Sequence, residues 1–203
     1  MPTHYQAASE GRHFVERFGI GCPSALAVVR PGEQGVFVRR PRADRLGSKV
    51  AGRFEAAAGR WGLIPLFSPD GADLLTHEAH AETAAAERNF LQPWKRGHRC
   101  VVLADTLFHS GGDGKAVIGV TRYDGQPLAL AGLWNGWRSP TGQCVESFAL
   151  LTLGTPARRN AVILPDAWVD DWLHCAVEET ASFLRPFTDD QLVQRHSGAM
   201  LAR

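Results

Sequence analysis

Two histidines and a glutamate lie close together at His77, Glu78 and His80, a combination that occurs in zinc sites. In the H-E-x-x-H motif of zinc proteases, the two histidines are four positions apart and face the metal from one side of a helix. Here the second histidine comes one position early, and no third ligand is evident nearby. The sequence therefore predicts no metal site at this segment.

Two further motifs lack residues that their chemistry requires. The segment Gly111–Lys115 is rich in glycine, like a phosphate-binding loop, but Ala116 stands where such a loop has the Ser or Thr that coordinates magnesium. Ser139 and Ser147 lack the G-x-S-x-G setting of a nucleophilic serine. We interpret the glycine-rich segment as a turn, and we predict that the protein needs no cofactor.

The tryptophans and cysteines give weaker indications of function. The chain has six tryptophans, of which we expect most in the core. One or two exposed rings could stack on nucleobases, each contributing about 1 to 3 kcal/mol. The four cysteines stand far apart and form no C-x-x-C pair, which is typical of reduced, structural thiols.

Strands are predicted where short β-branched or aromatic segments lie between glycines and prolines. These segments are Ala25–Val29, Val36–Arg40, Cys100–Leu103, Ala116–Thr121 and Phe148–Thr152. Turns are predicted at Ser110–Gly114, as a hairpin loop, and at Tyr123–Pro127, and a loop at Gly47–Gly59.

Helical patterns are fewer. They cover Thr3–Arg17, Ala79–Phe90 continuing to Trp94, Pro165–Val177 and Asp189–Arg195. Many strands with a few surface helices predict an α+β protein with a mainly antiparallel β sheet or barrel.

Composition limits the classes of protein that the chain can belong to. With 203 residues, of which 44% are hydrophobic, it can bury one substantial core, and we predict a single domain over residues 1–203. No apolar run approaches the roughly 20 residues that span a bilayer, and no signal-peptide pattern begins the sequence. We therefore expect a cytoplasmic protein that does not bind membranes.

The net charge of +1 conceals an uneven distribution, since residues 1–60 carry an excess of five positive charges. Nearly all of these are arginines, whose planar donors suit phosphate groups. The excess is compatible with a nucleic-acid surface, but a dedicated nucleic-acid domain usually has a stronger basic balance. Charge alone therefore favours an arginine-rich solvated face.

Five short segments stand in an order and spacing that identify a family. They are Arg60–Pro65, Ala81–Thr83, Arg99–Cys100 with Ala104–Asp105, Ala131–Trp134 and Ala161–Pro165. This series resembles the SOS response-associated peptidase (SRAP) family. The resemblance runs from the opening Met1–Tyr5 to Leu184–Phe187, and it implies the SRAP fold.

Members of that family, as the resemblance implies, bind single-stranded DNA and capture abasic sites through a cysteine directly after the initiator methionine. Here that position is Pro2. Glu78 replaces an asparagine that touches the abasic sugar, His109 replaces a catalytic glutamate, and Ala157 replaces a catalytic histidine. Thiazolidine formation needs an amine and a thiol on one residue, and proline supplies no sulfur.

The DNA-binding positions are better retained. Arg88 and Arg159 match phosphate-binding arginines of the family, whereas His80 replaces a third one. Trp61 matches a family tryptophan, and Phe67 stands where the family usually has another. Each of these five residues is a candidate DNA contact, although both aromatic residues could equally be packing residues and both arginines could be solvated or paired.

Three hypotheses follow. The first is a module of the DNA-damage response that binds single-stranded or abasic DNA and has lost crosslinking and peptidase-like activity, in short a pseudoenzyme. The second is an abasic-site lyase that uses Pro2, after removal of Met1, with His109 and Glu78 or Glu82. The third is a non-catalytic module that binds a protein partner. An acidic residue in a phosphate groove, such as Glu78, favours the third over the first.

Overall fold

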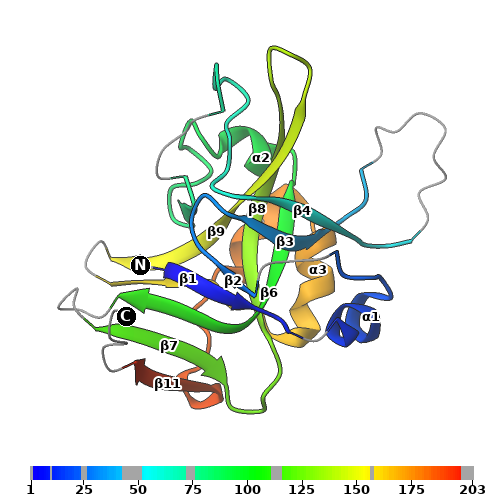
Figure 1. The fold of residues 1–203 in the computed structure, drawn as a ribbon. Helices are drawn as coiled ribbons and strands as arrows, with labels where there is room; N and C mark the ends of the chain where they lie inside the picture. The colour runs from blue at the N-terminus through cyan, green and yellow to red at the C-terminus, as the bar shows by residue number, and fades with distance from the viewer. Residues whose placement is uncertain are drawn as a thin grey trace, which may run out of the picture.

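The computed structural model describes residues 2–9, 11–23, 27–42, 52–71, 76–110, 116–155 and 158–197 (Figure 1). The strands are β1 Pro2–Ala7, β2 Val28–Val29, β3 Gln34–Arg39, β4 Glu55–Trp61, β5 Glu78–His80, β6 Arg99–Ser110, β7 Val117–Arg122, β8 Leu128–Arg138, β9 Cys144–Thr155, β10 Arg158–Ala161 and β11 Leu192–Ser197. The α-helices are α1 Arg12–Phe18, α2 Leu91–Lys95 and α3 Val169–His174. Three short 3-10 helices are η1 Asp166–Trp168, η2 Val177–Phe183 and η3 Asp189–Gln191.

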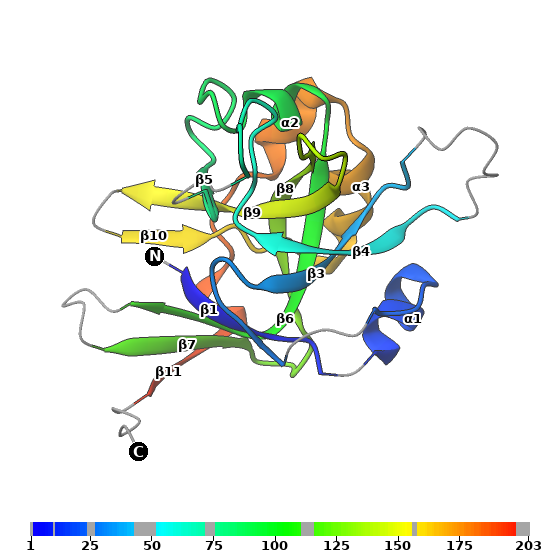
Figure 2. The same ribbon diagram turned by 45° about the horizontal axis from the view of Figure 1, so that its top comes forward.

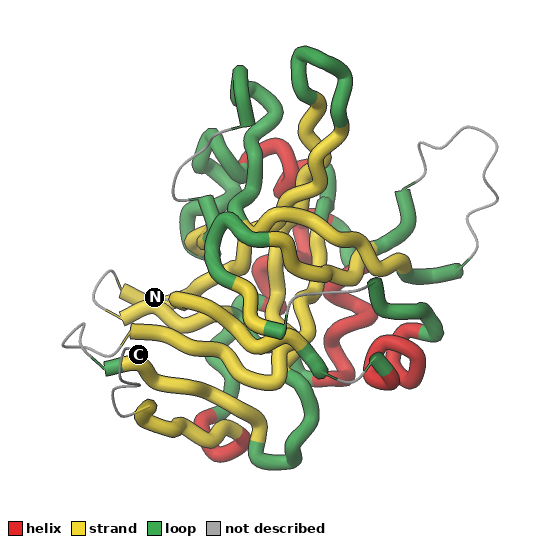
Figure 3. Tube along the Cα trace, viewed as in Figure 1, coloured by secondary structure: helices red, strands yellow, loops and turns green. Residues whose placement is uncertain are grey.

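Five strands close into a barrel (Figure 3). Around the ring, β3 pairs with β4, β4 with β9, β9 with β8, β8 with β6, and β6 with β3. Only the β4–β9 contact in this ring is parallel. The fold is thus α+β with a mainly antiparallel sheet, as predicted.

The long strands β6 and β9 continue past the barrel and carry the remaining strands. The second half of β6 pairs with β1 and β7, and β11 extends this sheet beyond β7. The end of β9 pairs with β5 on one side and β10 on the other. Figures 1 and 2 show the start of β1 between these two extensions.

The barrel strands are buried on both faces, which explains their nearly continuous apolar sequences. In β3, Phe37 faces one buried cluster while Val36 and Val38 face another. The first cluster draws residues from all five strands and fills the barrel. The second joins the outer face to Phe14 of α1 and Trp172 of α3. Alternate residues of a strand point to opposite faces, so each strand contributes to both clusters.

A glycine allows β1 to lie close to the barrel. A Cβ atom at Gly35 would lie only 2.1 Å from the hydroxyl oxygen of Tyr5, whose side chain is fully buried. Any larger residue would therefore push Tyr5 out of its place. This contact fixes the position of β1, and therefore also that of Pro2 at the start of the strand.

The segments predicted as strands, so far as they are described, contain strands, and Tyr123–Pro127 forms a turn around Gly125, whose φ is 73°. The strands on either side of the predicted hairpin loop, β6 and β7, pair antiparallel. Residues 111–114 of that loop lie outside the described residues, as do 47–51 of the loop predicted at Gly47–Gly59. The rest of that second prediction is wrong from Glu55 onward, because β4 begins there.

Two helix predictions are wrong because tertiary pairing overrides a local helical pattern. The first residues of the segment predicted as Thr3–Arg17 form β1 between β2 and β6, and the helix begins only at Arg12. The segment Asp189–Arg195 contains one 3-10 turn and then joins β11, which pairs with β7. In both cases a neighbouring strand supplies hydrogen bonds that a short helix cannot match.

The segment Ala79–Phe90 is also mostly not helical. Ala79 and His80 belong to β5, turns follow, and the helix α2 begins at Leu91. In contrast, the helix predicted at Pro165–Val177 corresponds to η1 and α3. Among the helices of the described residues, none is long and apolar enough to cross a membrane.

Candidate nucleic-acid site

Pro2 and His109 lie opposite each other where β1 begins and β6 ends. They are register partners in the antiparallel β1–β6 pair, next to an irregularity between Pro2 and His4. Pro2 is buried and His109 is partly buried. The two positions that correspond to the family's cysteine and glutamate are therefore brought together. An imidazole here can accept or donate a proton, but proline offers no thiol.

Glu78 is a buried carboxylate without hydrogen bonds. Its side chain is 4% exposed, and neither carboxylate oxygen has a hydrogen-bond partner in the described part of the chain. The Nε2 atom of His77 lies 3.6 Å from Oε1. Burial raises the pKa of Glu78, although nearby positive charge, including that of Arg159, opposes that shift. This carboxyl group therefore takes up a proton more readily than an exposed glutamate does.

Arg159 lies on β10 and is held by an ion pair. Its Nη1 atom lies 3.0 Å from Oε2 of Glu82 and 3.4 Å from the backbone oxygen of Thr152. The backbone N–H of Gly154 donates to the other carboxylate oxygen of Glu82 over 2.9 Å. Although partial burial acts in the opposite direction, the bonds from Gly154 and Arg159 hold the pKa of Glu82 below its usual range. Part of the charge of Arg159 is thus neutralised within the protein.

Phe67 and Arg88 form an exposed pair. The guanidinium carbon of Arg88 lies 4.0 Å from the centre of the Phe67 ring, and Phe67 is 47% exposed. A cation over an aromatic face is an attractive contact that holds both groups in place. The pair presents a flat apolar surface beside a positive charge, which is the combination that binds a nucleobase and its phosphate.

Trp61, predicted as a DNA contact, is completely buried. It is 0% exposed, and its indole N–H donates to the backbone oxygen of His77 over 2.9 Å. It packs in the barrel against Tyr5 instead. His80 is partly exposed at the end of β5, next to Thr152 in the register with β9. The position of Ala157 lies outside the described residues.

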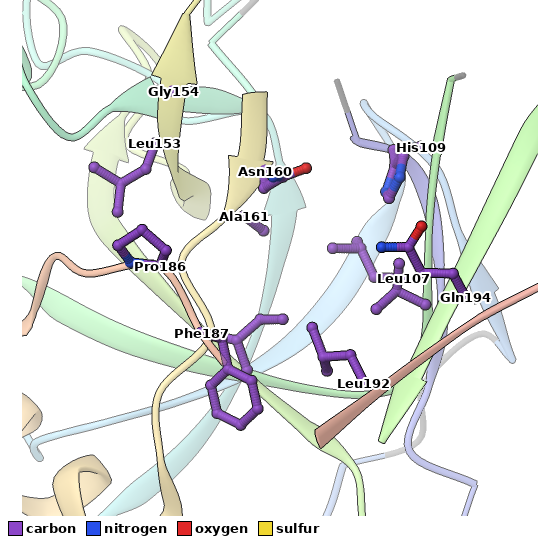
Figure 4. A pocket seen from close by; sticks show the side chains of 12 residues that line it. Leu107, His109, Leu153, Gly154, Asn160, Ala161, Pro186, Phe187, Leu192 and Gln194 are labelled. Atoms are coloured by element: carbon purple, nitrogen blue, oxygen red, sulfur yellow. The ribbon is translucent and has the colours of Figure 1, made fainter. Parts of the chain in front are cut away.

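A cavity of about 380 Å³ opens beside His109 (Figure 4). His109 forms part of its wall, together with Asn160 and Gln194. The sequence analysis missed these last two residues, because Gln194 was assigned to a helix and Asn160 carries no motif of its own. Only the position of β11 brings Gln194 to the site. Within the described ranges, no group of three His, Cys, Asp or Glu side chains could hold a metal ion.

The mixed barrel is shared with a known class of proteins. The family profile described as SOS response associated peptidase (SRAP) matches residues 4–197, and the chain belongs to this family. Among curated proteins, the abasic site processing protein HMCES of Mus musculus is 23% identical over 169 residues. The match covers 63% of this chain but 48% of that protein, so the chain spans about half the length of this relative.

Solved structures agree with the fold. A protein from Bordetella bronchiseptica is 30% identical with a TM-score of 0.85, covering 97% of this chain and 100% of its own. A protein from Bacteroides thetaiotaomicron is 20% identical with a TM-score of 0.78, over 96% and 91% of the two chains. A phage-related protein from Bordetella bronchiseptica is also 20% identical, with a TM-score of 0.67 over 97% and 93%. The last two support the architecture alone.

Proposed function

We propose that this protein binds single-stranded DNA, including strands with abasic sites, as a module of the DNA-damage response that forms no thiazolidine crosslink and has no peptidase-like activity. The observation that carries the proposal is the exposed pair of Phe67 and Arg88. Both lie at positions that the family uses for DNA, and together they offer stacking and charge at one place. The similarity to an abasic site processing protein supports the same class of ligand.

The proposed loss of crosslinking follows from chemistry at Pro2. In a thiazolidine, the amine and the sulfur of one N-terminal cysteine both bond to the carbon of the sugar aldehyde. Proline has the amine alone, and so cannot close the ring. The partner positions Glu78 and His109 differ from the family in the same cleft, which supports a general loss of the original reaction.

The charges of the cleft support weak binding rather than none. Glu78 puts a carboxylate where the family has a neutral amide, and Glu82 neutralises part of Arg159. We therefore expect a weak affinity that depends mainly on Arg88 and falls only gently with salt, because few phosphates are neutralised. The cytoplasmic location expected from the sequence is part of this proposal.

A titration of intact and abasic single strands at fixed salt tests the proposal. Arg88→Ala and Arg159→Ala should each weaken binding, whereas Arg53→Ala should not, because Arg53 lies near the start of β4 and pairs with Asp170. Affinity that is indifferent to Arg88 and Arg159 would refute DNA binding at this cleft and leave the protein-interaction hypothesis. A DNA adduct that survives denaturation without a reducing agent would refute the loss of crosslinking.

The pairing of Pro2 with His109 favours one further candidate, an abasic-site lyase. If Met1 is removed, the secondary amine of Pro2 can attack the sugar aldehyde and lose water to form an iminium ion. A base such as His109 then takes the C2 proton, the 3′ phosphate leaves, and water releases the amine. Borohydride should trap the iminium on abasic DNA, and a Pro2→Gly variant should form less adduct. Absence of trapping with processed protein excludes this candidate.

A further inference from the structure

The cavity beside His109 is a slot between two sheet extensions. On one side, Leu107, Val120 and Gln194 form a row across β6, β7 and β11, because each is the register partner of the next. On the other side lie Leu153 of β9 and Asn160 of β10, which are also register partners. Figure 4 shows these two walls facing each other, with Phe187 at one end.

Apolar and polar side chains both line the slot. Leu107, Leu192, Phe187 and Pro186 are apolar, whereas His109, Asn160 and Gln194 are polar and come from both walls (Figure 4). Each amide offers both a donor and an acceptor. Such a site suits a flat ring with an apolar face and a polar edge. The volume of about 380 Å³ lies at the small end of ligand pockets.

The slot adjoins residues of the candidate site described above. His109 lines the slot and is also the register partner of Pro2. Gly154 lines it as well, and its N–H binds the carboxylate that holds Arg159. Asn160 directly follows Arg159 on β10, so the two side chains leave the strand on opposite faces and only Asn160 lines the slot. A strand bound near Pro2 and His109 would therefore lie beside the slot.

We propose that this slot receives one unpaired nucleobase of the bound strand, with the polar edge of the base at Asn160 and Gln194. This inference rests on the proposed binding of single-stranded DNA. It adds a binding site for a base, next to the position where the family binds a sugar that has lost its base. The strand β11 contributes Leu192 and Gln194 to this site.

A scan along a single-stranded oligonucleotide tests the proposal. A tetrahydrofuran spacer, which lacks a base, replaces one nucleotide at a time, and the affinity of the full chain is measured for each strand. One position should lose about 5- to 150-fold in affinity, equivalent to about 1 to 3 kcal/mol for one stacked base. Spacers at other positions should have smaller effects or none.

Substitutions of residues that line the slot test whether this loss of affinity arises there. The double variant Asn160→Ala with Gln194→Ala changes two exposed side chains and should weaken the natural strand while leaving the sensitive spacer strand unchanged. Ala161→Leu, which narrows the slot, should act in the same direction. Gln143→Ala, an exposed glutamine in the turn between β8 and β9, is the matched control and should bind normally.

The outcomes separate this inference from the proposed function. If no strand binds, the proposed function fails and the slot proposal fails with it. If strands bind but the spacer scan is flat, or the double variant behaves like Gln143→Ala, the slot proposal alone is refuted. A single sensitive position that disappears in the double variant supports it.

Discussion

Replacing Glu78 by glutamine should strengthen DNA binding. The wild-type carboxyl group is 4% exposed, and its oxygens have no hydrogen-bond partner in the described structure. Glutamine keeps the size of the side chain and removes its negative charge. Because the family binds the sugar of the strand at this position, the substitution removes a repulsion between the cleft and the neighbouring phosphates.

The size of the effect follows from burial. A carboxylate and a phosphate about 8 Å apart repel by about 2 kcal/mol at an effective dielectric constant near 20, the value that suits a poorly solvated group. Screening by salt reduces this energy. Since about 1.4 kcal/mol corresponds to a tenfold change, we expect Glu78→Gln to bind about 5- to 30-fold more tightly at neutral pH.

The pH dependence gives a sharper test. Burial raises the pKa of Glu78, so the wild-type carboxyl group gains its proton before the pH falls to the usual range of glutamate. Wild-type affinity should therefore rise toward the variant's value as the pH falls through that raised pKa, and the gap between the two proteins should close. The stability of the wild-type protein should change with pH in the same direction as its affinity. Because the pKa of Glu78 is higher in the folded state than in the unfolded state, the free energy of unfolding should fall as the pH rises.

Fluorescence polarisation of a labelled single strand, at constant salt and over a range of pH, measures this gap. Chemical denaturation at the same pH values measures the stability. Glu16→Gln is the matched control, because Glu16 is exposed on α1, on the other side of the barrel from β5 (Figure 2). If Glu78→Gln binds no better than Glu16→Gln, or if its advantage is independent of pH, the argument from the buried charge is wrong.

Three further predictions concern DNA contacts and stability. Phe67→Ala should weaken binding by about 1 to 3 kcal/mol, because it removes the stacking contact. Arg88→Ala should weaken binding and make the salt slope smaller by about 1, because it removes a phosphate contact. A double-mutant cycle should show that the two effects are not additive, because the two side chains are in contact. Burial and nearby arginines lower the pKa of His98 to about 4, so wild-type stability should fall as the pH drops from about 6.5 toward that value, by up to about 3 kcal/mol, while His98→Phe keeps the stacking on Trp134 and loses this dependence in denaturation curves. Gly35→Ala should lower the free energy of unfolding by about 1 to 3 kcal/mol or more, because the added Cβ meets Tyr5; unchanged stability would show that β1 is less tightly placed than the structure has it.

The sequence predicts the strands better than the helices, for a physical reason. A segment such as Val36–Arg40 has two β-branched valines around an aromatic residue and lies between Gly35 and Pro41, so its own sequence favours a strand. In contrast, Thr3–Ala7 and Leu192–Arg195 are strands only because β6 and β7 offer them edges to pair with. Those partners lie far away in the chain, and no local pattern reveals them.

The sequence by itself determined which chemical groups the site contains. It shows that the position after Met1 has no sulfur, that Glu78 carries an acid in place of an amide, and that Arg88 and Arg159 are retained. These are covalent facts about side chains, and folding cannot change them.

Only the tertiary structure decided what those groups meet, because burial and distance depend on strand pairing. The barrel encloses Trp61 and removes it from the DNA surface, and the cation–π contact joins Phe67 to Arg88. The β5–β9 pairing buries Glu78 without a hydrogen-bond partner among the described residues, which raises its pKa. The pairing of β11 with β7 brings Gln194 to the slot beside His109.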